Sequence, residues 1–75
     1  MRESYAIRIN RNLLPPEYLP GYNNRADVEE YLQIMEREPG AIYSIVYVRE
    51  YLNRARDRDG NFTISTIAEL PDPNN

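Results

Sequence analysis

The chain has 75 residues and a formal net charge of −3; all nine basic residues are arginine, and lysine, histidine, cysteine and tryptophan are absent. Without these residue types it lacks the usual general base, the thiolate and amine nucleophiles, the common transition-metal ligands and any disulfide. The acidic balance argues against a general affinity for nucleic acid or anionic membranes. We therefore expect one domain over residues 1–75 that is not an enzyme, needs no cofactor and binds no metal. Because no apolar run is long enough for a membrane span and the first residues lack a signal peptide's apolar core, we expect a cytoplasmic protein.

The N-terminal third predicts one strand followed by a loop. Residues 4–11 alternate between apolar and polar positions, which indicates a half-buried strand with Tyr5, Ile7 and Ile9 on one face. Residues 13–24 contain three prolines and one glycine. This composition predicts an extended, Pro-rich loop without regular structure.

A helix is expected over residues 27–38. Asp27 is its expected N-cap, and Glu30 completes a capping box three residues later. Apolar residues recur at i, i+3, i+4 and i+7, which predicts a core-facing stripe made of Val28, Tyr31, Leu32 and Met35. Pro39 and Gly40 should end the helix.

Two strands are expected after the helix. Residues 41–48 are rich in Ile, Val and Tyr and carry apolar side chains on both faces, which is typical of a central strand. Residues 62–70 alternate again and predict a second strand. The final residues, 71–75, should form a frayed tail.

Residues 49–58 fit either of two structures. Asp59-Gly60 is typical of a two-residue hairpin turn, which would pair Ala55 with Ile64 and Arg56 with Thr63. The apolar spacing from residue 48 to residue 55 also fits a short helix. We favour the hairpin.

Together these elements predict a small single α+β domain in β-α-β-β order, with a three-stranded sheet and one main helix packed on one face. A chain of this length buries little core, and one face of the central strand remains apolar without a cover. Both features lead us to expect a homodimer.

Two segments match short motifs, and each has a simpler interpretation. Residues 15–18 match the PPxY motif that WW domains bind, but the same segment can pack against the sheet. Residues 57–68 resemble an EF-hand calcium loop, but Phe62 stands where the loop needs glycine and Ala68 where it needs a bidentate glutamate. We interpret this second segment as a polar turn followed by a strand.

The leading functional hypothesis is a non-enzymatic module that binds a protein partner. Acidic residues on the outer helix face and several tyrosines, a residue type enriched at interfaces, are the candidate contacts. They are Glu29, Glu36, Glu38, Tyr18, Tyr22 and Tyr47. In its small size, acidity and tyrosine content, the chain resembles the small inhibitors that phages encode against host defence or transcription complexes. The acidic residues would engage a basic groove of the partner.

The alternative hypothesis is an oligomer that binds a nucleotide or another phosphate-bearing ligand, or nucleic acid. Arginine forks match phosphate oxygens, and a tyrosine ring can stack on a base. The candidate residues are Arg49, Arg54, Arg56, Arg58 and Tyr51. Because acidic residues alternate with these arginines, the net charge of the segment is barely positive, which is also typical of a solvated surface.

Overall fold

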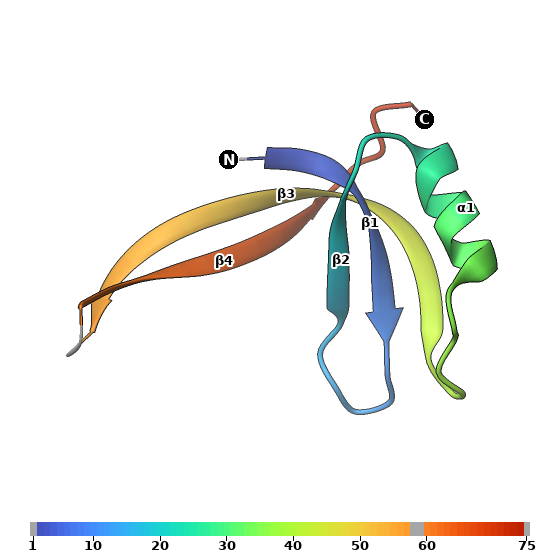
Figure 1. Cartoon of the computed structure of the whole chain (residues 1–75), viewed down its shortest axis with the longest axis horizontal. Coiled ribbons are helices and arrows are strands. Elements are labelled where there is room, and N and C mark those ends of the chain that lie inside the picture. The colour runs from blue at the N-terminus through green and yellow to red at the C-terminus, as the bar shows by residue number, and fades with distance from the viewer. Residues whose placement is uncertain (1, 58–59, 75) are drawn as a thin grey trace.

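The computed structural model describes residues 2–57 and 60–74, and four strands and one helix lie within them. The elements are β1 (Arg2–Asn10), β2 (Glu17–Tyr22), α1 (Arg25–Ile34), β3 (Ile42–Asp57) and β4 (Gly60–Leu70). The strands form one antiparallel sheet in the order β2-β1-β3-β4, and α1 packs on one face of it (Figure 1). The α+β class is thus confirmed. The sheet has four strands instead of the predicted three, and the element order is β-β-α-β-β instead of β-α-β-β. Among the described residues, no helix has the length and apolar character needed to cross a membrane.

The sequence did not predict strand β2, which occupies part of the expected Pro-rich loop. Its Pro20 lies opposite Ala6 of β1. An edge strand tolerates proline because its outer side needs no ladder hydrogen bond. Gly21 adopts a φ of +108°, and the register of β1 with β2 shifts between Tyr5 and Ala6. The edge position therefore accommodates Pro20, and the bulge accommodates Gly21, the two residues that had indicated a loop.

Helix α1 begins two residues earlier than expected. Its N-cap is Asn24, whose backbone is extended and whose Oδ1 accepts a hydrogen bond from the backbone N–H of Asp27 at 2.9 Å. The prediction that Asp27 caps the helix is therefore wrong. Asp27 lies in the first turn instead, where its carboxylate is still favoured by the positive end of the helix dipole.

Helix α1 also ends four residues earlier than expected. Glu38 precedes Pro39, and a residue before proline is disfavoured in helical conformation. The guanidinium of Arg37 donates to the carbonyl oxygen of Leu32 at 3.1 Å. This contact satisfies one carbonyl of the last turn, so the helix can stop before the proline.

The core lies between α1 and the centre of the sheet. Its buried members come from β1 and α1 and are Tyr5, Ile7, Ile9 and Val28. Three of the four residues in the predicted helix stripe pack in or against this cluster: Val28, Leu32 and Met35. Tyr31, the fourth residue of the stripe, is 40% exposed.

Residues 49–57 continue β3, so the hairpin interpretation is confirmed and the helix is excluded for them. The predicted pairing is wrong by two residues: Ala55 pairs with Phe62 instead of Ile64, and Arg56 with Asn61 instead of Thr63. A two-residue shift leaves every side chain on the same face, so the alternation of the sequence cannot detect it.

Candidate functional site

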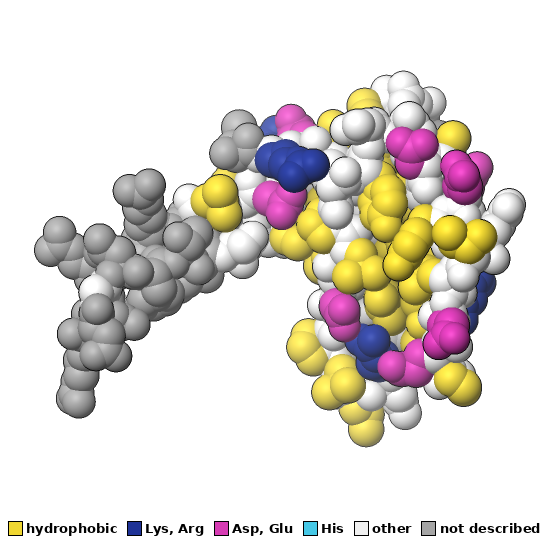
Figure 2. All heavy atoms as spheres, in the orientation of Figure 1, with side chains coloured by type: hydrophobic (Ala, Val, Ile, Leu, Met, Phe, Trp, Pro, Cys, Tyr) yellow, Lys and Arg dark blue, Asp and Glu magenta, His cyan; other side chains and the backbone are white. Residues whose placement is uncertain are grey.

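A groove of about 250 Å³ lies between the end of β2 and helix α1. It is lined by Tyr22, Asp27, Glu30, Tyr31 and Ile34, and we call it the α1–β2 groove. Figure 2 shows apolar side chains gathered between β2 and α1, with acidic side chains along their border. The groove is therefore an apolar surface bordered by negative charge.

Four of the five groove residues lie on one row of α1. Residues 27, 30, 31 and 34 follow the i, i+3, i+4, i+7 spacing, so they project from the same side of the helix. Tyr22 meets this row from β2, with its ring centroid 6.0 Å from that of Tyr31 and the two rings inclined by 38°. Burial, and then the neighbouring Tyr31, raise the pKa of the Tyr22 hydroxyl. The neutral phenol is thus the stable form at neutral pH.

The groove carboxylates differ from most other described carboxylates because no described arginine pairs with them. Among the side chains that the structure describes, six carboxylates form ion pairs with arginine: those of Glu3, Glu17, Glu29, Glu38, Glu69 and Asp72. Four others in the same part of the chain form none, namely Asp27, Glu30, Glu36 and Glu50. Two of these four line the groove. The charge there is available to a partner.

The predicted partner-binding residues do not form one surface. Tyr22 lies in the groove, whereas Tyr47 packs against the core in a T-shaped contact with Tyr5, at a centroid distance of 5.0 Å. The three carboxylates predicted for the outer face of the helix lie in different environments. Glu29 pairs with Arg25 at 3.3 Å, Glu38 pairs with Arg11 at 2.9 Å, and Glu36 is exposed beyond the end of the helix.

Tyr18, the remaining predicted contact, lies on the sheet face opposite α1. Its hydroxyl donates to Glu69 of β4 at 2.5 Å, and Nη1 of Arg8 contacts both oxygens of the same carboxylate at 2.9 and 3.0 Å. This back-face cluster joins β2 and β4, the two edge strands of the sheet. Ala6 and Val48 lie on the same face and are fully buried, although no helix covers them. The back-face cluster therefore helps to shield this face of the sheet from solvent.

The back-face cluster also bears on the PPxY match. Tyr18, the tyrosine of the motif, lies in β2 and is bound to Glu69. The hydrogen bond from Tyr18 lowers the pKa of Glu69, and the same bond raises the pKa of Tyr18. A WW domain would have to separate this pair and unfold the end of β2 before it could bind the segment. The packed interpretation of residues 15–18 is the one that the fold supports.

Within the predicted phosphate site, the structure describes the side chains of Arg49 and Tyr51. Arg49 pairs with Glu3 at 3.2 Å and donates to the hydroxyl of Tyr51 at 3.3 Å, so its charge is already compensated. Arg58 and the side chains of Arg54 and Arg56 lie outside the described part of the chain. The same holds for much of the EF-hand-like segment.

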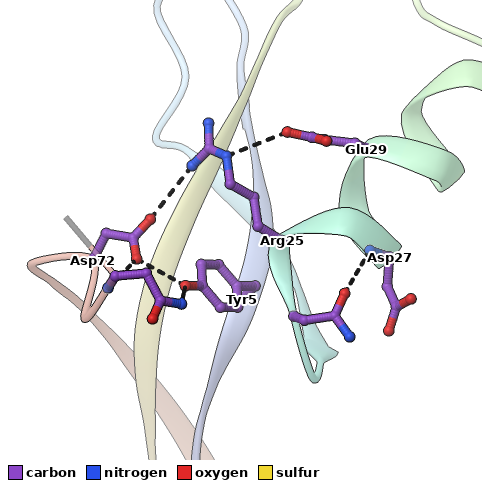
Figure 3. Close-up of polar contacts among 7 residues, drawn as sticks. Tyr5, Arg25, Asp27, Glu29 and Asp72 are labelled. Atoms are coloured by element: carbon purple, nitrogen blue, oxygen red, sulfur yellow. Dashed lines mark hydrogen bonds and ion pairs between the residues drawn. The ribbon is translucent and has the colours of Figure 1, made fainter.

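Residues 71–74, predicted to be frayed, lie against Tyr5 and the start of α1 without regular secondary structure (Figure 3). The Tyr5 hydroxyl donates to Asp72 at 2.7 Å and accepts from the side-chain amide of Asn74 at 2.8 Å. Arg25 approaches the second oxygen of Asp72 at 3.4 Å. Hydrogen bonds from the Asn74 backbone and from Tyr5 lower the pKa of Asp72, and the bond to Asp72 raises that of Tyr5.

Comparison of the chain with protein-family models, with curated proteins and with solved structures finds no significant match.

Proposed function

We propose that the protein is a non-enzymatic binding module that holds a basic, apolar segment of a protein partner in the α1–β2 groove. The observation that carries this proposal is the position of two carboxylates without a described arginine partner, Asp27 and Glu30, beside the apolar lining of the groove. Most other carboxylates near the helix are neutralised within the chain. A partner segment with arginine or lysine at this point would pair with Asp27 and Glu30, as arginines of the chain pair with other carboxylates.

The apolar part of the groove supports the same occupant. Ile34 is 76% exposed and Tyr31 is 40% exposed, although both belong to the helix that forms the core. A bound segment that covers them removes apolar area from water, which favours binding by about 25 cal/mol per Å² before the costs of association. Tyrosine is also one of the residue types that contribute most to binding energy at interfaces.

The charges of the groove define the class of partner. Complementary charge steers encounter and rejects acidic segments more than it adds affinity. A surface that combines arginine or lysine with apolar side chains is typical of proteins that bind nucleic acid. We therefore propose such a protein as the target, in the manner of the small phage inhibitors that the chain resembles in composition.

Selection from a random peptide-display library on the immobilised protein tests this function. The recovered peptides should combine arginine or lysine with leucine, isoleucine or aromatic residues. Their affinity should fall about tenfold or more in the Asp27→Asn/Glu30→Gln variant, because two facing charges are lost. The Glu29→Gln/Glu36→Gln variant is the matched control: it loses the same charge from the same segment but leaves the groove intact, and it should retain affinity.

Two outcomes would contradict the proposed function. Recovery of acidic peptides, or of peptides without basic residues, would show that the groove carboxylates do not select the partner. Equal loss of affinity in both double variants would show that binding depends on the overall charge of the helix and not on the groove.

A further inference from the structure

The size of the α1–β2 groove suits one side chain of a partner better than a small molecule. Pockets that bind drug-sized ligands measure about 300–1,000 Å³ and enclose most of the ligand. This groove measures about 250 Å³ and is open to solvent along α1, where Tyr31 and Ile34 are exposed. One long side chain of a bound segment would fill it.

A carboxylate and an aromatic ring lie one helical turn apart in the groove. Asp27 and Tyr31 are related by i, i+4, the spacing at which side chains on a helix are neighbours. Glu30 belongs to the same row. The ring of Tyr22 packs beside that of Tyr31 at a centroid distance of 6.0 Å, which restricts the positions open to the Tyr31 ring. A cation that reaches the Asp27 carboxylate is therefore close enough to lie on the Tyr31 ring as well.

Arginines elsewhere in the chain make both of the contacts that such a cation needs. The guanidinium carbon of Arg37 lies over the ring of Tyr43, 5.7 Å from its centroid, while Nη2 donates to a carbonyl oxygen of α1. Arg11 contacts two carboxylates at once, through Nη1 to Glu17 at 2.8 Å and through Nε to Glu38 at 2.9 Å. A planar guanidinium that lies flat on a ring keeps N–H groups at its edge for such acceptors.

We propose that the partner segment places one arginine on the Tyr31 ring, with its guanidinium between the carboxylates of Asp27 and Glu30, and that the groove prefers arginine to lysine. The site is the groove of the proposed function, on which this inference rests. Lysine carries a compact, strongly hydrated ammonium without a flat surface, so it can reach the carboxylates but gains less from the ring. The methylene stem of the arginine extends toward Ile34, whose apolar side chain is exposed on the same row.

Exchange between arginine and lysine in the bound segment tests the preference. The probes are the tightest-binding peptide from the display selection and its copies with each basic residue changed, one at a time, to the other basic type. At one position the arginine form should bind about fivefold tighter or more than the lysine form, measured by titration calorimetry. The side-chain proton resonances of that arginine should also shift upfield on binding, because these protons lie over an aromatic ring.

Two variants of Tyr31 show whether the ring causes the preference. Tyr31→Leu keeps an apolar side chain but removes the ring, so the arginine and lysine forms should bind within about twofold of each other. Tyr31→Phe restores the ring without the hydroxyl and should restore the preference for arginine. The ratio of the two affinities is the readout, because a disturbance of the helix would weaken both forms alike.

The outcomes separate this inference from the proposed function. Basic peptides that bind equally well with lysine or arginine at every position would overturn the inference and leave the proposed function intact. A preference for arginine that survives in Tyr31→Leu would assign it to the carboxylates alone and would overturn the role of the ring. Tighter binding of a copy with trimethyllysine, which cannot donate a hydrogen bond, would overturn arginine as the occupant. A selection that returns no basic peptide would overturn both the proposed function and the inference.

Discussion

Leu13 combines a rare backbone conformation with almost complete exposure. It lies in the turn between β1 and β2, where the N–H of Leu14 donates to the carbonyl oxygen of Arg11 at 3.3 Å. Its φ is +63°, in the left-handed region, and its side chain is 94% exposed. That conformation costs about 1–2 kcal/mol for a residue with a Cβ atom. No burial of the leucine offsets this cost in the monomer.

Leu13→Asn should therefore stabilise the fold. Asparagine tolerates the left-handed conformation better than leucine does, and almost no buried apolar area is lost. We expect a gain of about 0.5–1 kcal/mol in the free energy of unfolding, measured by urea denaturation. Leu14→Asn changes the other exposed leucine of the turn, whose φ is not positive, and should stay within about 0.5 kcal/mol of wild type. A destabilised Leu13→Asn variant would show that the leucine side chain has a role in the folded monomer.

At the scale of secondary-structure elements, the back-face cluster connects strands that are not neighbours in the sheet. Tyr18 of β2 and Glu69 of β4 lie on opposite edges, and Arg8 of β1 contacts the same carboxylate. Their contact requires the sheet to curl until its two edges approach each other. The curl explains how Ala6 and Val48 are buried on a face that carries no helix.

Removing the Tyr18 hydroxyl should loosen β2. Tyr18→Phe deletes one hydrogen bond to a charged but partly exposed acceptor, so we expect a loss of about 0.5–1.5 kcal/mol in the free energy of unfolding. Tyr31→Phe makes the same chemical change where the hydroxyl bonds to no described residue, and it should be nearly neutral. Faster amide exchange in β2 should accompany the Tyr18 change. Equal effects of the two variants would contradict the role of the cluster.

For the whole molecule, four titrating groups that hydrogen-bond to one another in two pairs contribute to the dependence of stability on pH. The pKa values of Asp72 and Glu69 are lowered in the folded state, chiefly by hydrogen bonds from the Asn74 backbone and from Tyr18, respectively. Their stabilisation is present above the unfolded pKa of about 4 and is lost as the pH falls through the folded pKa. The pKa values of Tyr5 and Tyr18 are raised by bonds to the same two carboxylates. Their stabilisation is present below the unfolded pKa of about 10 and is lost as the pH rises through the folded pKa.

We therefore expect a stability plateau between about pH 5 and pH 9 with a decline on both sides. Thermal unfolding across this range is the measurement. Asp72→Asn should make the acid decline shallower, whereas Glu36→Gln, which changes a carboxylate without an ion pair to a described residue, should leave it unchanged. Stability that rises on acidification below pH 4 would contradict this account.

Of the candidate site, the sequence alone pointed to Tyr22, and the rest of the groove emerged only from the fold. The row of residues 27, 30, 31 and 34 on α1 has the same helical spacing as the predicted core stripe and lies one position away from it. Apolar spacing identified the side of α1 that meets the sheet, but it did not show which segment would lie beside the neighbouring row. That segment is β2, which the sequence did not predict as a strand and whose Tyr22 meets Tyr31 of the row.

Local sequence patterns were enough to predict the α+β class, the alternation of β1 and the apolar stripe of the helix, and they favoured a long hairpin over a helix for residues 49–58. These features depend on periodicity along a short stretch of chain, which local residue patterns record. Three features followed only from the folded structure: that β2 is a strand, which residues pair across the β3–β4 hairpin, and which described carboxylates have no described arginine partner. Each of these depends on a neighbour that is distant in sequence. Pro20 is acceptable because β2 lies at an edge, and Asp27 and Glu30 have no described arginine partner because Arg25, the arginine of the same helix, pairs with Glu29 and Asp72.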